Sequence, residues 1–148
     1  MSFKINATTI MSPVFRPTMG KIVNIDLPTK TAWNVRRLVK QIDKIVKELE
    51  ENQVSLIKKF AEKDEEGRIV PDKDKETGEL IQGSYVIPKE NQAELNQEGI
   101  KLMNRSFTVE SNKILFTDLE NANLSVVDLE ILEPMLDGMD NFKENIEE

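Results

Sequence analysis

The side chains that could carry out chemistry in this chain of 148 residues are acidic groups, lysines, hydroxyls and one tyrosine, because the sequence contains no cysteine and no histidine. Thiolate nucleophiles, zinc sites with thiolate or imidazole ligands, and serine–histidine triads are therefore excluded. What remains is a hard cation held by carboxylates, a carboxylate pair, or a lysine, tyrosine or serine acting without imidazole. The candidates Asp118, Glu120 and Asp128 are too scattered to nominate as metal ligands. We predict no catalytic residue, no metal site and no cofactor.

Two stretches resemble ligand-binding motifs and fail when compared position by position. Residues 72–83 begin like a calcium loop, but Thr77 stands where that loop needs Gly and Gly83 stands where it needs Glu. Residues 78–84 have the glycine spacing of a phosphate-binding loop, yet Ser84 occupies the place of the lysine that would reach the phosphates. We therefore expect neither calcium nor nucleotide binding here.

The strongest pattern in the sequence is a heptad-like repeat of apolar residues after Pro28. No Gly or Pro interrupts residues 29–64, and the apolar positions step alternately by three and four, which predicts one long helix over this range. We call these positions the seam: Val35, Leu38, Ile42, Ile45, Leu49, Asn52 and Leu56. The polar Asn52 either fixes the register of a coiled coil or lies in water where the helix leaves its core. At roughly 1.5 Å per residue the helix would extend about 54 Å, so we expect part of it to project or to be covered by another subunit.

Basic residues recur at helical spacing away from the seam. They are Arg36, Lys40, Lys44 and Lys47, with Lys30 and Arg37 nearby and Asp43 as the opposing acid. A phosphate backbone can use such a row. However, we find no aromatic residues interleaved with this row for base stacking, and the whole chain is acidic, with a pI of about 4.8. We therefore expect the row to face acidic protein groups, from this chain or from a partner, rather than nucleic acid.

The charges are divided unevenly along the chain. Residues 1–63 carry a net charge of +6 and residues 64–148 a net charge of −13, within a total of −7. This asymmetry fits packing of one half on the other, head-to-tail association of copies, or separate surfaces for two partners.

The remaining segments predict an α+β fold, with the long N-terminal helix and two shorter helices around a small, mostly antiparallel sheet. We expect one domain over residues 1–136 and an acidic tail over 137–148. Ser125, followed three residues later by Asp128, predicts a capping box at the start of a helix. The other predicted elements are extended pieces before residue 20, a strand over 21–27, a hairpin or flap over 67–88, a helix over 89–104, and a strand pair formed by 106–110 and 113–116.

The order of these elements resembles that of an uncharacterised family of small proteins encoded by tailed bacteriophages. The segments that carry the resemblance are Leu27–Arg37, Leu56–Gly67 and Leu124–Leu132, and it extends over about residues 21–136. Residues 2–20 and 72–84 depart from the family's pattern. The resemblance implies phage origin and supplies no catalytic residue.

We infer from the sequence a non-enzymatic phage protein, a virion or assembly component, that acts through contacts with its own copies or with a host or phage protein. The seam would provide the anchors and the basic row would set orientation. One alternative is a phage-encoded inhibitor of a host defence or DNA-processing enzyme that uses its acidic C-terminal half in place of phosphates. Another is an enzyme using carboxylates and a divalent metal. The chain has no apolar run of the length that spans a membrane and begins without a signal-peptide pattern, so we expect it in the host cytoplasm or in the virion.

Overall fold

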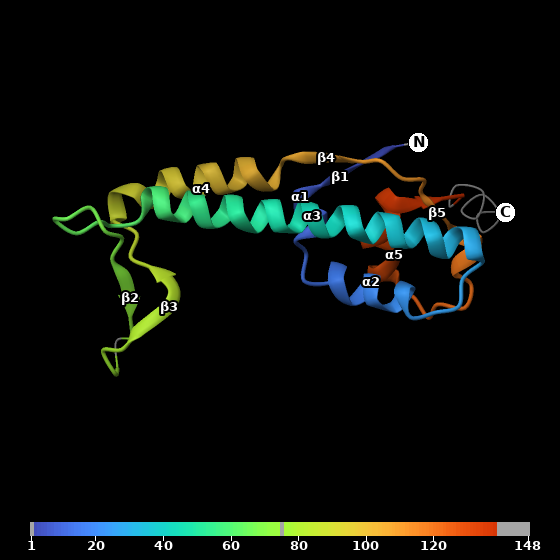
Figure 1. Ribbon diagram of the computed structural model, residues 1–148, viewed down its shortest axis with the longest axis horizontal. Helices are drawn as coiled ribbons and strands as arrows, with labels where there is room; N and C mark the ends of the chain where they lie inside the picture. Colours follow the sequence, from blue (N-terminus) through green and yellow to red (C-terminus); the bar gives the residue numbers. More distant parts are fainter. Residues whose placement is uncertain (1, 75, 139–148) are drawn as a thin grey trace. The chain divides into compact units, whose positions relative to one another are not determined.

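The computed structural model describes residues 2–74 and 76–138 and confirms the α+β class. In this part of the chain the strands form three separate two-stranded pairings, two antiparallel and one parallel, rather than one small sheet. The elements, shown in Figure 1, are β1 (Phe3–Asn6), α1 (Ala7–Ile10), α2 (Phe15–Val23), α3 (Thr29–Phe60), β2 (Pro71–Lys73), β3 (Leu80–Tyr85), α4 (Lys89–Met103), β4 (Ser106–Val109), β5 (Ile114–Leu115), the 3-10 helix η1 (Phe116–Leu119), α5 (Val126–Leu132), the 3-10 helix η2 (Glu133–Met135) and β6 (Leu136–Asp137).

Contacts within the chain divide it into two compact units, where we had predicted a single domain over residues 1–136. Unit 1 consists of residues 1–47 and 104–148, and unit 2 of residues 48–103. The division follows the apolar side chains, since nearly all those found buried belong to unit 1. The predicted acidic tail does not begin at residue 137, because Asp137 belongs to β6, and residues 139–148 of that prediction lie outside the described residues.

In unit 1, α2 occupies residues for which we predicted extended structure. Its buried side chains Phe15, Met19 and Ile22 are spaced by four and three, the period of one helix face. Pro17 lies in the first turn, where a backbone N–H has no partner within the helix and its loss costs little. The prediction of a strand over 21–27 is therefore wrong.

The strand pairing of unit 1 also differs from the prediction. β4 pairs antiparallel with β1, so that Phe3 lies opposite Val109 and Ile5 opposite Phe107. All four of these side chains are buried, on one side of the two-stranded ribbon. The segment predicted as the partner of β4 instead forms β5, which pairs in parallel with β6. Pairing with β1, which buries the apolar side chains of both strands, is therefore preferred over the predicted hairpin of 106–110 with 113–116.

In unit 2, α3 ends at Phe60, four residues before the predicted end at 64. The Oδ1 atom of Asp64 accepts hydrogen bonds from the backbone N–H groups of Glu66 and Arg68, both at 2.9 Å. Gly67, with φ of 82°, completes this turn in the left-handed region. Local side-chain bonding of this kind competes with helix continuation. Beyond the turn, β2 and β3 form the predicted antiparallel hairpin, and α4 matches the predicted second helix.

Candidate interaction surfaces

The seam of α3 is mostly interior. Five of its members are buried, with at most 9 % of the side chain exposed: Val35, Leu38, Ile42, Ile45 and Leu49. Asn52 and Leu56 are half-buried. The five buried residues form part of this chain's own core, so they are not available as anchors for another molecule, contrary to the sequence-based hypothesis. The change from buried to half-buried falls between Leu49 and Asn52, shortly after α3 enters unit 2 at Glu48.

Unit 2 leaves apolar side chains uncovered. Among its described side chains, those buried are Leu49, Phe60 and Ala61, and α4 contributes none. On the second half of α3, Val54 is 46 % and Ile57 is 37 % exposed, and Ile100 of α4 is 61 % exposed. Asn91 Nδ2 in the first turn of α4 donates to Phe60 O at 3.1 Å, which fixes the start of α4 at the end of α3. The two helices therefore form a pair with little interior of its own.

The basic residues of α3 lie on the solvent side of unit 1. Those singled out in the sequence, Arg36, Lys40, Lys44 and Lys47, are all exposed, as are Lys30 and Arg37. Since consecutive helix positions rotate by about 100°, these six residues cover the sector opposite the buried seam. Asp43 lies at the edge of that sector. The predicted assignment of the two faces is thus confirmed for this half of the helix.

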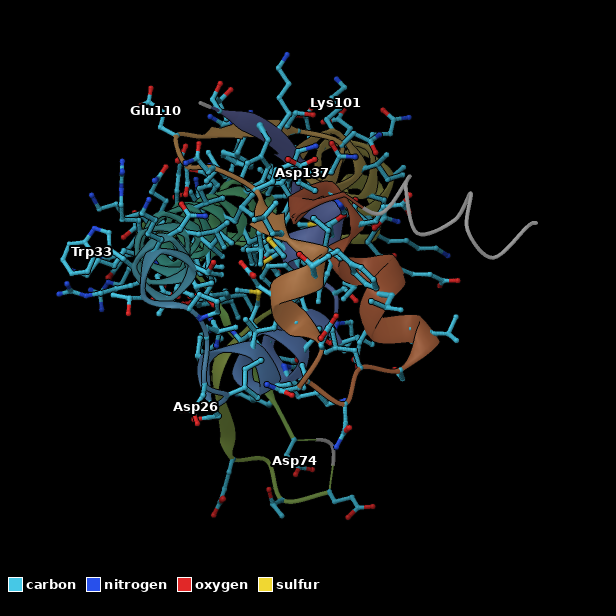
Figure 2. All side chains as sticks on the ribbon, turned by 90° about the vertical axis from the view of Figure 1, so that its right-hand side faces the viewer. Asp26, Trp33, Asp74, Lys101, Glu110 and Asp137 are labelled. Carbon is cyan, nitrogen blue, oxygen red and sulfur yellow. The ribbon has the colours of Figure 1, made fainter. Side chains whose placement is uncertain are left out.

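Trp33 lies within this basic sector and was missed in the sequence. It is 60 % exposed, and the guanidinium carbon of Arg36 lies 5.0 Å from the centroid of its ring. Figure 2 shows the indole pointing outward from α3. The signal that could have found it is its spacing, because Trp33 follows Lys30 by three residues and precedes Arg37 by four. Our statement that no aromatic residue is interleaved with the basic row is therefore wrong, because Trp33 lies between Lys30 and Arg36.

Two open clefts adjoin the first turns of α3. One of about 630 Å³ is lined by Thr29, Lys30, Trp33, Asn34, Arg37 and Asn112. The other cleft has a volume of about 610 Å³. Lys30, Asn34 and Asn112 line it as well, and so do Lys113 and Asp137. The described residues that line both clefts belong to unit 1.

Hydrogen bonds hold the loop after β4 against α3 and so shape these clefts. Asn34 Nδ2 donates to Asn112 O, and Ser111 Oγ donates to Asn34 Oδ1, both at 2.7 Å. About two turns further along the helix, Gln41 Nε2 donates to Glu110 O at 2.8 Å while Gln41 Oε1 accepts from Glu110 N at 2.7 Å. Two amide side chains about two helical turns apart thereby fix the backbone of residues 110–112.

Asp128 is a buried acidic group with a structural explanation. As predicted, it forms a capping box with Ser125, whose Oγ accepts from the backbone N–H of Asp128. Its carboxylate also accepts from Thr18 Oγ1 and Lys21 Nζ, both at 2.6 Å. The Lys21 ammonium, followed by the hydrogen bonds from Thr18 and Ser125, holds the pKa of Asp128 well below its usual range. All of its partners belong to the protein, so Asp128 ties α5 to α2.

The structure does not bring the scattered carboxylates together. No cluster of three or more acidic groups suitable for a metal ion occurs among residues 2–74 and 76–138. Asp118 accepts a hydrogen bond from Thr31 and is separate from the Asp128 network. Within the same described residues, no helix combines the length and the apolar composition that crossing a bilayer requires.

Comparisons with known proteins add no relative from which a function could be transferred. No protein-family model, curated protein or solved structure matches this chain. Function is therefore inferred from the two exposed surfaces of α3, the apolar one in unit 2 and the basic one in unit 1.

Proposed function

We propose that this protein is a non-enzymatic assembly component that binds a second copy of itself through the second half of α3. The observation that carries the proposal is the open apolar surface of unit 2, centred on Val54 and Ile57. The resemblance of the chain's element order to that of small tailed-bacteriophage proteins supports a role in the virion or in virion assembly. The contact region thus differs from the first half of the seam, where we had expected the anchors.

The first supporting step is the small interior of unit 2. A 56-residue unit in which three described side chains are buried gains little hydrophobic stabilisation from its own folding. Covering Val54, Ile57 and their neighbours removes apolar area from water at about 25 cal/mol per Å². Association with another helix is the usual way in which an amphipathic helix buries such a stripe.

The second step is charge complementarity, which favours a copy of the same chain as the partner. Glu51, Val54 and Lys58 share one face of α3, at spacings of three and four residues. If two copies of α3 pair antiparallel about the middle of this segment, Glu51 of each copy faces Lys58 of the other. Such an arrangement is isologous and closes at two subunits. Each copy therefore supplies both the apolar centre and the opposite charges at its ends.

The alternative of a phage-encoded inhibitor that mimics nucleic acid depends on the acidic C-terminal half. Of the 11 acidic residues after Arg105, four lie beyond residue 138 and outside the described residues. Among the other seven, Asp128 accepts hydrogen bonds from Thr18 and Lys21 inside unit 1. No specific observation favours this alternative over self-association.

The proposal is tested by light scattering after size-exclusion chromatography over a range of protein concentrations. We expect a dimer for the natural chain and a monomer for Val54→Asp, because the new carboxylate would be placed in the apolar centre of the interface. Val126→Asp is the matched control, since Val126 is 73 % exposed at the start of α5, outside unit 2. A natural chain that is monomeric at every concentration, or a Val126→Asp variant that dissociates equally, would refute the proposal.

A further inference from the structure

We infer that the outer side of the first half of α3 binds single-stranded nucleic acid, with Trp33 as the stacking platform for a base. We call this surface the basic face; it consists of Lys30, Trp33, Arg36, Arg37, Lys40, Lys44 and Lys47. It belongs to unit 1 and is independent of the proposed self-association through unit 2. The inference differs from our sequence-based expectation, which took the row to have no interleaved aromatic residue and favoured acidic protein groups as its partner.

Charge is the first part of the case. The basic face carries six cations, and two exposed acidic residues, Asp43 and Glu48, lie at its edges. Successive members recur once per helical turn, about 5.4 Å apart along the axis, so the cations form a continuous line rather than a single cluster. A linear polyanion suits such a line, because each phosphate neutralised by Lys or Arg releases condensed counterions. The net charge of −7 for the whole chain does not remove this local concentration of positive charge.

The second part of the case is Trp33, which favours a nucleic acid over an acidic peptide as the bound polyanion. The indole is 60 % exposed, so a large part of its ring surface is open to a ligand. Arg36 lies against the ring at 5.0 Å from the centroid, which adds a cation to the platform. Indole and guanidinium groups together are the groups on which unpaired bases stack. An acidic peptide would use the cations but has no planar base to place on the indole.

The cleft beside Trp33 provides the third part. Its lining combines two cations, Lys30 and Arg37, with the polar side chains of Asn34 and Asn112. The amide of Asn34 is held by hydrogen bonds to the loop of Ser111 and Asn112, so this wall of the cleft is fixed before a ligand arrives. A phosphate held by the two cations would keep the adjoining base next to the indole. A duplex, whose bases are already stacked, could reach this surface only through its phosphates.

The test uses Trp33 itself as the reporter, because it is the single tryptophan of the chain. We expect a 15-residue oligothymidylate at low salt to quench the tryptophan emission in a saturable way. The logarithm of the binding constant should fall with the logarithm of salt concentration at roughly 0.7 per phosphate contact, giving a slope of about −4 for six contacts. Replacing two contacts in the double variant Lys40→Gln/Lys44→Gln should reduce that slope by about 1.4. The control Lys4→Gln removes an exposed charge on β1 and should leave the slope unchanged.

The stacking role is tested separately with a dye-labelled oligothymidylate and fluorescence anisotropy. Trp33→Ala should weaken binding by about 5- to 150-fold, the loss that corresponds to one stacked base, and Trp33→Phe should retain part of it. Because Trp33 is exposed, neither variant should unfold the protein, which circular dichroism verifies. Absence of saturable quenching would overturn the inference. So would equal competition by a polyglutamate of the same charge, which would identify an acidic protein as the ligand, or equal affinity for a duplex.

Discussion

A single carboxylate joins distant segments of unit 1. Asp128 Oδ1 accepts from Thr18, and its Oδ2 accepts from Lys21 and from the backbone N–H of Ser125 at 2.9 Å. Thr18 and Lys21 belong to α2, and Ser125 caps α5. Because the side chain is 6 % exposed, removal of any partner would leave a buried carboxylate less well satisfied. The same contacts favour the ionised form and lower the pKa of Asp128.

This lowered pKa predicts an acid-dependent loss of stability. The carboxyl group of an unfolded chain titrates near 3.9, so the contribution of Asp128 is fully present above that pH and is lost as the pH falls toward its lower value in the folded protein. We expect Asp128→Asn to lower the melting temperature at pH 7, and the difference from the natural chain to shrink below about pH 4. Thermal unfolding between pH 2.5 and 7 measures it, with the exposed Glu130→Gln on the same helix as control. A difference that does not change with pH would show that ionisation of Asp128 is unimportant.

Part of this network follows from local sequence and part does not. The capping box of Ser125 and Asp128 could be predicted, because both members lie within one helical turn. Thr18 and Lys21 precede Asp128 by 110 and 107 residues, and their arrival depends on how α2 packs. Trp33 is a different case, because its spacing from the basic residues was visible, but its exposure depends on the absence of a covering segment.

At the scale of elements, the assignment of a buried and an exposed face to α3 can be tested by substitutions at two adjacent positions. Ile45 is buried and Lys44 is exposed. Ile45→Asp should lower the free energy of unfolding by about 3–5 kcal/mol, since it removes a buried aliphatic chain and introduces an unpaired charge. Lys44→Asp should change it by less than about 1 kcal/mol. Urea unfolding followed by circular dichroism gives both values, and the reverse order would contradict the orientation of the helix.

The elements differ in how well the sequence predicts them, for physical reasons. α3 and α4 are long helical segments, so their period or composition dominates the signal. α2 was misassigned because Val23, Ile25 and Leu27 alternate as in a strand, whereas the helix uses the earlier apolar positions ending at Ile22. The partner of β4 lies about one hundred residues earlier, in β1, and no local pattern specifies such a pairing.

At the scale of the whole chain, the periodic seam does not reveal which of its members the chain covers. Leu49 and the seam residues before it are buried, and Asn52 and Leu56 are only half-buried, although the apolar spacing is continuous. Coverage depends on the number of apolar side chains that other segments bring to the helix, and among the described side chains unit 2 has few buried ones. The division into two units could therefore not be predicted from the heptad pattern alone.

The basic and acidic parts of the chain make contact inside unit 1, as packing of one part on the other requires. Lys21 and Asp128 form an ion pair that joins the two parts within unit 1. The cations of the basic face instead remain exposed to solvent. The uneven distribution of charge thus contributes an ion pair to the packing of unit 1 and also leaves the basic face of α3 exposed.

The most direct test of self-association through unit 2 is sedimentation equilibrium of a charge swap across the proposed two-fold axis. Glu51→Lys or Lys58→Glu alone should weaken dimerisation about 5- to 30-fold, because each places like charges opposite each other at both ends of the interface. The double variant Glu51→Lys/Lys58→Glu should recover the dimer, since opposite charges again face each other. A double variant as weak as either single one, or a natural chain that sediments as a monomer throughout, would contradict the account.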